Sequence, residues 1–499
     1  MQEGGADGTF AGTKAVALLL SVALQSGLAS VAQAAPPRLP CTDAHETLCG
    51  DGGPAVQARL LRPTGVANDG RGGFLVADTG NDAVRRVLPN GVISTVAGLG
   101  IGGYTGDGGL AVAAALNAPA DVSAVPDGAV LIADSGNGVI RQVSAKGIIT
   151  TVAGAAPGAP AYAPSTSPTG ARMVRLSNPQ GVAALPAGGF LIADTGDNQM
   201  ALVTPDGLLS VVAGSGAPSN SGDGGAAQAA TLNLPTRVVP TPDGGFLILD
   251  LGNGVVRQVS PTGTIGTVAG SHTSTSAPPG LALNPGGLAA DPQGNVYVIV
   301  DRQVFRVAPG GVATAIAGTG ECGSTGDGGP AIDALLAQPA GLAVTAAGDV
   351  LVADINDGGS AVGNVRDVSG ADGSIATVAG AANDGSSCIA AGGSRSGALW
   401  PVFFITAPRS AHAGKAITIR FSTTRGGAVR TLLIKKGKKV RSKQQTARAG
   451  GNSVTLGGVK KGTYTMRITA KGDVPNNNAD EGGTLHLSKR FDAALKVTR

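Results

Sequence analysis

Hydrophobic residues recur in short runs that alternate with turn residues along most of the chain. In the first clear unit these runs cover residues 65–67, 74–77, 83–88 and 92–97, and Gly, Asp and Asn residues separate them. Short apolar runs bounded by such residues are typical of strands joined by tight turns. The pattern therefore predicts a meander of four antiparallel strands and no long helix.

The same unit returns six times. An aspartate ends the second run of each unit, and these aspartates lie 51 to 60 residues apart: Asp78, Asp134, Asp194, Asp250, Asp301 and Asp354. About 20 residues after each one, another apolar run ends in glycine, as in Thr95-Val-Ala-Gly98. One four-stranded sheet cannot bury both of its faces, whereas several sheets packed radially can. The repeat predicts an all-β fold, a six-bladed β-propeller over residues 50–395.

The repeated unit resembles the NHL repeats of exported bacterial proteins. The resemblance rests on P-x-G-V-A around Gly65, on G-F-L-V-A-D-T-G-N around Asp78, and on the V-R-x-V and T-V-A-G runs that follow. It covers roughly residues 50 to 380 and implies a six-bladed propeller. The third and fifth units depart from the pattern, because residues 157–179 and 272–279 replace the usual connection. In the third unit, Ala201 stands where other units have arginine: Arg85, Arg141 and Arg257.

Composition agrees with a turn-rich β protein and divides the chain into two parts. The 81 Gly and 30 Pro among 499 residues disfavour helices, while 42% hydrophobic residues exclude a disordered chain. Residues 35–400 carry a net charge of −11, and residues 401–499 carry +16. We expect an acidic body and a basic tail that bind different partners.

The N-terminus resembles a secretory signal peptide. Ala15–Leu24 are apolar, Lys14 precedes them, and Ala32-Gln-Ala34 is a small-x-small cleavage site. Residues 1–34 are therefore predicted to be removed, which gives a secreted or cell-surface protein with no transmembrane span in the mature chain. The alternative is an uncleaved anchor, since Glu3 and Asp7 make the start poor in positive charge, but the apolar run is shorter than the ~20 residues of a span.

Four cysteines fit two disulfides in an exported protein, with three ways to pair them. We favour Cys41 with Cys49, which closes an N-terminal loop at 35–49, and Cys322 with Cys388, which enter and leave the sixth unit. Zinc is disfavoured because there is no C-x2-C pair and no histidine cluster beside a cysteine.

Two sets of carboxylates are candidate binding residues. The first contains the six aspartates named above, and the second lies in Gly-Asp-Gly-Gly connections: Asp51, Asp107, Asp223 and Asp327. Strand direction alternates in a meander, which predicts that both sets lie on one acidic face that recognises a protein or glycan ligand.

The competing interpretation is structural. First-set aspartates would pair with an arginine seven residues later, as Asp78 with Arg85, Asp134 with Arg141 and Asp250 with Arg257. Each glycine-rich loop would lead into a short helix such as 55–60. Ca²⁺ is the one cation these loops could hold, although the D-x-D-x-D-G spacing is missing. We expect no cofactor.

The sequence contains few residues of the types that catalytic sites use. The resemblance implies relatives among propeller lyases and lactonases, whose channels use several His, Tyr and Glu side chains. Residues 35–400 contain two His, two Glu and three Tyr, and no G-x-S-x-G or H-E-x-x-H motif. We therefore expect a binding or scaffold protein of the cell envelope. The alternatives are a metal-dependent lyase or hydrolase with its site in the channel, and a surface-coat subunit that self-associates.

Residues 396–499 alternate like short strands and resemble the immunoglobulin-like β-sandwiches of exported bacterial proteins. A basic hairpin is predicted to attach the protein to a cell-wall polyanion, through Lys435, Lys436, Lys438, Lys439, Arg441 and Lys443. Other interpretations are a solvated turn that protects an edge strand, or docking on the acidic propeller face. Nucleic acid is disfavoured because few aromatic residues are available for base stacking. We expect a monomer.

Overall fold

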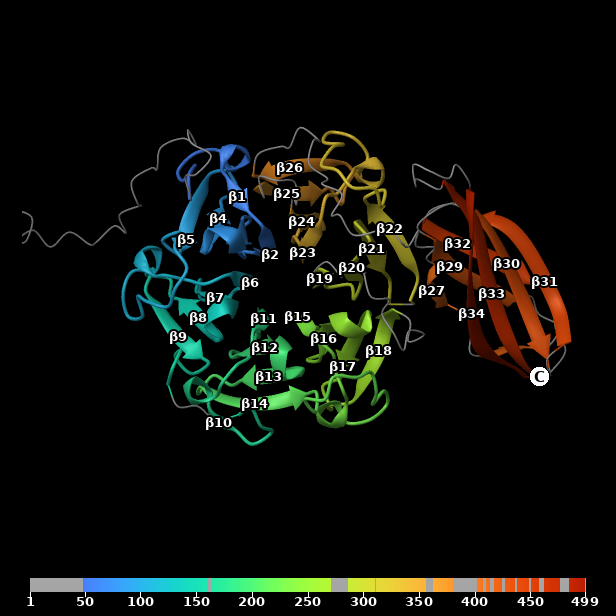
Figure 1. Cartoon of the computed structure of the whole chain (residues 1–499), viewed down its shortest axis with the longest axis horizontal. Helices are drawn as coiled ribbons and strands as arrows, with labels where there is room; N and C mark the ends of the chain where they lie inside the picture. The colour runs from blue at the N-terminus through green and yellow to red at the C-terminus, as the bar shows by residue number, and fades with distance from the viewer. Residues whose placement is uncertain are drawn as a thin grey trace, which may run out of the picture. The chain divides into compact units, whose positions relative to one another are not determined.

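A computed structural model describes residues 48–159, 163–270, 286–309, 311–355 and 362–380, and the backbone of the strands between 402 and 498. The elements in these ranges are β-strands and three-residue 3-10 turns. From 63 to 379, the strands form six antiparallel sheets, which are arranged around one axis as the blades of a propeller (Figure 1). The all-β six-bladed propeller predicted from the repeat is confirmed.

Each blade is a meander of four strands that follow one another in sequence. Blade one has β2 (Pro63–Asn68), β3 (Phe74–Asp78), β4 (Ala83–Val87) and β5 (Ile93–Ala97). Blade two has β6 (Pro119–Ala124), β7 (Val130–Asp134), β8 (Val139–Val143) and β9 (Ile149–Ala153), and blade three has β11 (Pro179–Ala184), β12 (Phe190–Asp194), β13 (Gln199–Val203) and β14 (Leu208–Ala213). Blade four has β15 (Pro235–Pro240), β16 (Phe246–Asp250), β17 (Val255–Val259) and β18 (Ile265–Gly270), and blade five has β19 (Leu288–Ala290), β20 (Val296–Val300), β21 (Gln303–Val307) and β22 (Ala313–Ala317). Blade six has β23 (Pro339–Val344), β24 (Val350–Asp354), β25 (Val362–Val368) and β26 (Ile375–Ala379).

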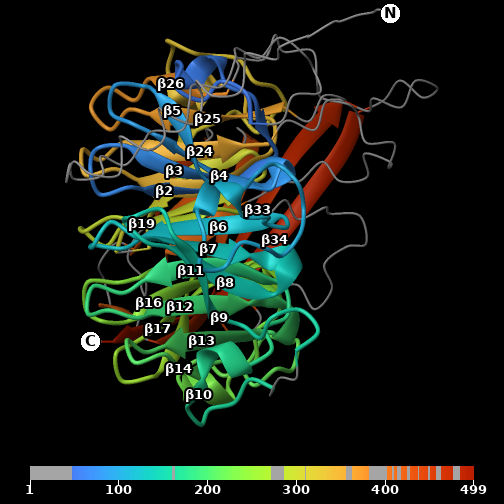
Figure 2. The same ribbon diagram turned by 90° about the vertical axis from the view of Figure 1, so that its left-hand side faces the viewer.

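Neighbouring blades cover each other's faces. Seen from the side, the sheets of blades one, two and three lie one above another as separate layers (Figure 2). All five residues of β3 are buried, and so are those of β7, β12, β16 and β24. A strand buried on both faces needs a continuous apolar run rather than alternation, which explains the F-L-V-A pattern in the sequence.

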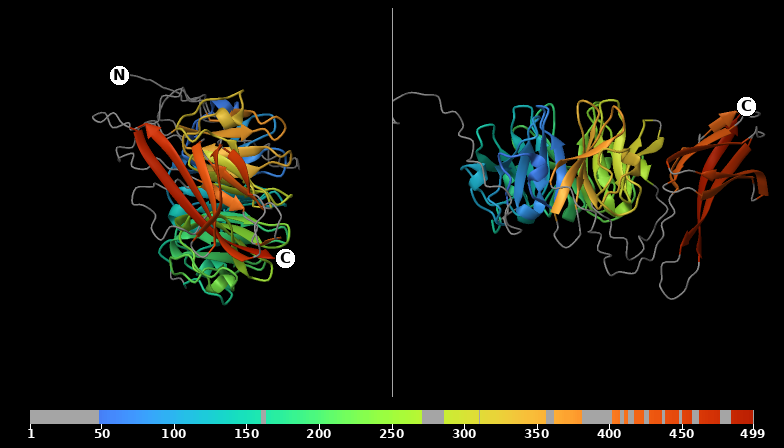
Figure 3. Two further views of the ribbon diagram at one scale, coloured as in Figure 1. Left: turned by 90° about the vertical axis from the view of Figure 1, so that its right-hand side faces the viewer. Right: turned by 90° about the horizontal axis from the view of Figure 1, so that it is seen from above.

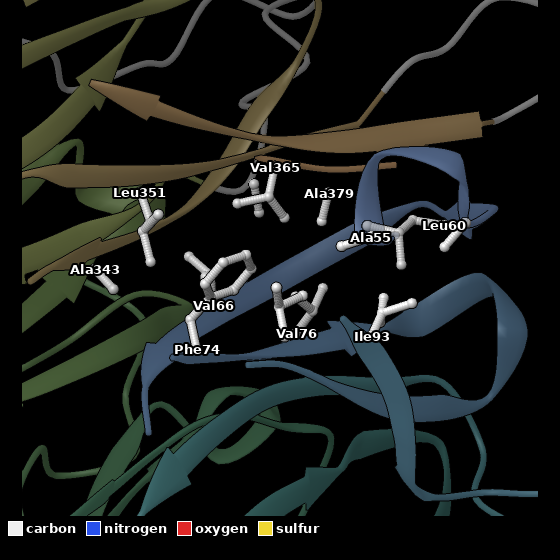
Figure 4. Close-up of a cluster of buried hydrophobic side chains, with 13 residues drawn as sticks. Ala55, Leu60, Val66, Phe74, Val76, Ile93, Ala343, Leu351, Val365 and Ala379 are labelled. Carbon is white, nitrogen blue, oxygen red and sulfur yellow. The ribbon is translucent and has the colours of Figure 1, made fainter. Parts of the chain in front are cut away.

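The ring closes between blade six and blade one through the segment that precedes blade one. Ala55 and Leu60, from the segment before blade one, pack with Phe74 of blade one and with Leu351 and Val365 of blade six (Figure 4). Two backbone contacts add to this cluster: Gly380 N–H donates to Ala55 O at 2.9 Å, and β1 (Leu60–Leu61) pairs with β25. Burying side chains of this size stabilises a fold by about 1.5–3 kcal/mol each.

The segment before blade one contacts blade six in the way that the connection between blades one and two contacts blade one. Between blades one and two, Gly98 N–H donates to Ala111 O, as Gly380 does to Ala55. Both acceptors begin a 3-10 turn, η1 (Ala55–Gln57) and η3 (Ala111–Ala113), and the same turn recurs as η5 (Ala171–Met173), η7 (Ala227–Ala229) and η9 (Ala331–Asp333). The helix expected at 55–60 is thus only a 3-10 turn, followed by strand β1.

The tail strands form two sheets, drawn in orange and red in Figure 3. One has the order β27 (Val402–Thr406), β29 (Ile417–Thr423), β32 (Gly450–Leu456); the other has the order β28 (Ser410–His412), β34 (Thr484–Thr498), β33 (Gly462–Pro475), β30 (Gly427–Lys435), β31 (Lys438–Ala447). Strands β30 and β31 form the predicted hairpin, with Lys435 opposite Lys438, and β31 is an edge strand. The immunoglobulin-like sandwich stays a prediction.

Several expectations fall outside the described residues. These are the signal peptide at 1–34, the domain limits near 34 and 395, and residues Cys41, Cys388 and Lys436. Cys49 and Cys322 are both disulfide-bonded, but the pairing we favour stays a prediction. Among the described residues, no helix has the length and apolar character needed to cross a membrane.

Candidate functional site

One register position of the innermost strands differs between the blades in charge and size. Glycine occupies it in blades one, three and six, but blade two has Asp121 and blade four has Arg237. Arg237 Nη2 donates to Thr64 O in blade one at 2.7 Å, and Nη1 donates to Gln180 O in blade three at 2.8 Å. The guanidinium therefore bridges from blade four to blade one and to blade three.

Asp121 is the buried counter-charge of Arg237. Its Oδ2 accepts from Val182 N–H at 3.1 Å, and burial raises the pKa of its carboxyl, although the positive charge of Arg237 opposes that rise. The glycines at this level leave space for the two side chains, since a Cβ on Gly65 would lie 2.8 Å from Asp121 Oδ1. Sequence reasoning missed both charges, although the repeat carries a signal for them: P-A-D-V-S at Asp121 and P-T-R-V-V at Arg237 replace P-x-G-V-A.

The first set of predicted carboxylates is buried inside the blades, except for Asp301. Asp78 is 0% exposed; its Oδ2 accepts from Asn81 Nδ2 at 2.9 Å and from Arg85 Nη1 at 3.3 Å, and its Oδ1 accepts from Leu61 N–H at 2.7 Å. The equivalent residues Asp134, Asp250 and Asp354 are also buried. The expected pairs with arginine are present for Asp78–Arg85, Asp134–Arg141 and Asp250–Arg257.

The second set supplies another counter-ion to the same arginines. Asp107 Oδ1 lies 2.8 Å from Arg141 Nη2, and Asp223 Oδ1 lies 2.6 Å from Arg257 Nη2. Asp51 pairs with Arg85 in the same way, and Asp223 Oδ2 also accepts from Thr267 N–H at 3.1 Å. Each complete blade thus holds one buried arginine between two aspartates. We call this group the blade triad.

The glycine-rich connections lie along the outer edge of the blades, which corrects their expected position on the turn face. Gly52 N–H donates to Ile93 O at 2.8 Å, and Ile93 N–H donates to Gly53 O at 3.1 Å. The same exchange recurs at Ile149, Ile265 and Ile375. The motif therefore pairs with the start of the outermost strand and covers an edge that would otherwise be open to other chains.

Blade six has a triad that the sequence pattern did not reveal. Arg366 is fully buried, pairs with Asp327, and its positive charge acts on Asp354. It follows Asp354 by twelve residues instead of seven, because residues 356–361 lengthen the connection. The signal that could have located it is the strand V-R-D-V before T-V-A-G, which matches V-R-R-V in blade one.

Blade five has lost the triad. Val300 corresponds to Asp78 of blade one, because it pairs with Gln303 as Asp78 pairs with Ala83. Buried Phe305 corresponds to Arg85, because it pairs with Ala315 as Arg85 pairs with Thr95. Asp301, expected as the fifth aspartate of the ring, instead lies exposed in a tight turn with φ 47°. The repeat alignment was one residue out of register here. Apolar side chains replace an ion pair at this place, an exchange that buried sites often tolerate.

Blade three keeps the aspartate and loses the arginine. Asp194 is 0% exposed, and Ala201 occupies the arginine position. Where a second aspartate would cap the outer strand, Val211 N–H donates to Ser165 O at 2.7 Å. Burial, with a smaller contribution from the charge of Asp197, raises the pKa of Asp194 to about 8. Burial also raises the pKa of Asp134, Asp250 and Asp354, to about 6 in each case, where an arginine opposes the rise.

The structure thus brings candidate residues together in pairs around one arginine within a blade, and not on one shared face. First-set carboxylates other than Asp301 lie inside individual blades, second-set carboxylates lie at the rim, and side-chain exposure in the second set ranges from 8% at Asp51 to 42% at Asp223. Within the described residues, no group of three or more His, Cys, Asp or Glu side chains could hold a metal ion. The polar and charged side chains of the propeller mostly stabilise individual blades.

These features define a six-bladed β-propeller, and part of the chain is similar to NHL repeats. The model of the teneurin NHL domain matches residues 30–104. Teneurin-3 of Mus musculus is 31% identical over 246 residues, and teneurin-3 of Danio rerio is 31% identical over 243 residues; each match covers 44% of this chain. The matched part is 9% of the length of either relative, so the likeness concerns a small portion of those proteins.

The chain is also similar to several solved structures, at low sequence identity. A protein of unknown function from Bacteroides thetaiotaomicron is 15% identical, with a TM-score of 0.44 and coverage of 64% of this chain and 72% of that one. An auxiliary nutrient binding protein from the same organism is 13% identical, with a TM-score of 0.41 and coverage of 60% and 68%. Virginiamycin B lyase from Staphylococcus aureus is 13% identical, with a TM-score of 0.38 and coverage of 64% and 84%.

Proposed function

We propose that this chain is an exported, non-catalytic binding or scaffold protein of the cell envelope. The propeller recognises a protein or glycan ligand, and the basic hairpin β30–β31 attaches the protein to an envelope polyanion. The observation that carries the proposal is that the arginines of the triads and the channel are held in internal ion pairs or hydrogen bonds. Recognition is thereby left to the connecting loops, where propellers of many functions carry their binding sites.

The turn face is the surface we propose for the ligand. It is the face that carries the turns after the second strands, namely η2 (Thr79–Asn81), η4 (Ser135–Asn137), η6 (Thr195–Asp197) and η8 (Leu251–Asn253). Two large apolar side chains are exposed beside these turns: Ile101 at 65% and Leu234 at 48%. Leu234 N–H donates to Asn198 Oδ1, which fixes its loop against the turn of blade three. Apolar side chains held in place on a polar surface favour a binding role.

The alternative of a metal-dependent lyase or hydrolase gains no support from the channel. A divalent cation at the level of Arg237 would lie close to its guanidinium. Like charges repel strongly where water is excluded. Asp121, the buried carboxylate at that level, already offsets this arginine. We therefore place ligand recognition on the turn face and not inside the channel.

Partition onto isolated cell envelopes across a salt series tests both parts of the proposal. Replacing the hairpin residues Lys435, Lys438, Lys439, Arg441 and Lys443 with Gln should abolish the salt-sensitive fraction of binding. Replacing exposed Lys146 and Arg172 of the propeller is the matched control and should leave that fraction unchanged. Binding that resists salt should be lost in Ile101→Ser with Leu234→Ser. Full binding by both sets of variants would refute the proposal.

A further inference from the structure

In complete blades, a positively charged nitrogen lies between two oxygen atoms. Arg141 Nη1 is 3.4 Å from Asp134 Oδ2 and 3.4 Å from Ala115 O. In blade four, Arg257 Nη1 is 3.6 Å from Asp250 Oδ2 and 3.4 Å from Thr231 O. Both oxygens are acceptors, and the guanidinium satisfies them together. We call the place of this nitrogen the Nη1 position.

An asparagine completes this arrangement from the turn after the second strand. Asn137 Nδ2 donates to Asp134 Oδ2 at 2.8 Å, and Asn253 Nδ2 donates to Asp250 Oδ2 at 2.7 Å. The Oδ2 atom of each buried aspartate thus faces two side-chain donors. Since an unpaired buried carboxylate is costly, both donors contribute to the stability of the blade.

Blade three has replaced both donors. Ala201 corresponds to Arg141 of blade two, because it pairs with Ile192 as Arg141 pairs with Ile132. Asp197 corresponds to Asn137, because each is the last residue of its turn, η6 and η4. One donor has become a methyl group, and the other has become a second acceptor. The Oδ2 atoms of Asp194 and Asp197 are both buried, and neither has a hydrogen-bond partner among the described residues.

A third oxygen belongs to the same place. Ser177 N–H donates to Asp194 Oδ1 as Asn117 N–H donates to Asp134 Oδ1, both at 2.7 Å. The residue two positions earlier, Arg175, therefore corresponds to Ala115, whose carbonyl accepts from the guanidinium in blade two. The Arg175 side chain offers little compensation, because it is 66% exposed and its Nη2 lies 3.9 Å from Asp197 Oδ2.

We propose that the Nη1 position of blade three is a Ca²⁺ site formed by Asp194 Oδ2, Asp197 Oδ2 and the carbonyl oxygen of Arg175. Hard oxygen ligands in an irregular loop setting suit Ca²⁺, and two carboxylates balance its charge. Mg²⁺ fits less well because it requires a near-ideal octahedral arrangement. The site differs from the glycine-rich loops, whose aspartates already pair with arginine. The cation takes over the electrostatic role that arginine has in blades one, two, four and six.

Thermal unfolding of the full mature chain, with CaCl₂ as the probe, tests this site. For a Kd of ~0.1–1 mM, typical of extracellular sites, about 10 mM CaCl₂ should raise Tm by roughly 2–8 °C. Asp197→Asn restores the donor that the sister blades use. It should raise Tm without Ca²⁺ and remove the response to Ca²⁺. Asp206→Asn, an exposed carboxylate in the same blade, is the matched control and should keep the response.

Three results would overturn the proposal. The first is a wild-type Tm that Ca²⁺ leaves unchanged, together with no heat of binding in calorimetry. The second is a Ca²⁺ response that persists in Asp197→Asn, which would locate the ion elsewhere. The third is a Tm that responds to pH through Asp194 and Asp197 but not to Ca²⁺, which would show that the two carboxylates share a proton instead of a metal ion.

Discussion

Replacing Arg257 with alanine gives blade four the residue that blade three has naturally at this position, Ala201, while Asn253 and Asp223 of blade four remain. In the wild type, Arg257 pairs with Asp250 and Asp223, and the pKa of Asp250 is about 6. In blade three, where Ala201 stands at the arginine position, the pKa of Asp194 is about 8. We expect Arg257→Ala to raise the pKa of Asp250 toward that value.

The cost of this substitution should depend on pH. The difference of about two pKa units corresponds to about 3 kcal/mol, an upper limit because Asp197 contributes to the shift at Asp194. Loss of the buried arginine stem adds about 2 kcal/mol at every pH. A folded-state pKa raised above the unfolded value gives stability that is lost as pH rises. The destabilisation should therefore grow from about 2 kcal/mol near pH 5 to about 5 kcal/mol near pH 9.

Urea unfolding at a series of pH values measures this growth. Gln258→Ala changes the next residue of β17 without changing charge, and its cost should stay constant with pH. Adding Asp250→Asn to Arg257→Ala removes the titrating carboxyl and should abolish the pH-dependent part. If the cost of Arg257→Ala is the same at low and high pH, the arginine does not hold Asp250 ionised, and our account of the triad is wrong.

Other substitutions test the channel and the ring closure. Arg237→Met should destabilise the propeller by about 3–5 kcal/mol because it leaves Asp121 buried without its counter-charge, whereas Arg237→Met with Asp121→Asn should recover much of the loss in the same denaturation assay. An additive double variant would contradict a charge interaction across the channel. Leu60→Ala, in the cluster that joins blades one and six, should cost about 2–5 kcal/mol by urea unfolding. Leu110→Ala, at a residue that is 59% exposed, should cost under about 0.5 kcal/mol, and equal costs would argue against closure by this cluster.

Much of the fold follows from local sequence. Strands need only a few residues of apolar pattern bounded by turn residues, so six copies of the unit predict six four-stranded blades. The pairs of Asp78 with Arg85, Asp134 with Arg141 and Asp250 with Arg257 were also predictable, because both members lie on adjacent strands seven residues apart. Where a connection changes length, as before Arg366, this local rule fails, although the positive charge of Arg366 still acts on Asp354.

Tertiary structure decided what joins distant segments. Asp51 meets Arg85 across 34 residues, and Arg237 reaches Thr64 across 173, so no local pattern encodes either contact. The register of blade five likewise became visible only from its strand pairing, whereas Ala201 in place of arginine was already visible in the repeat. The sequence by itself determined the repeating unit, because hydrophobic periodicity acts within a blade. The ring, the bridge made by Arg237 and the partners of the buried charges depended on packing between blades, where proximity in space is independent of separation along the chain.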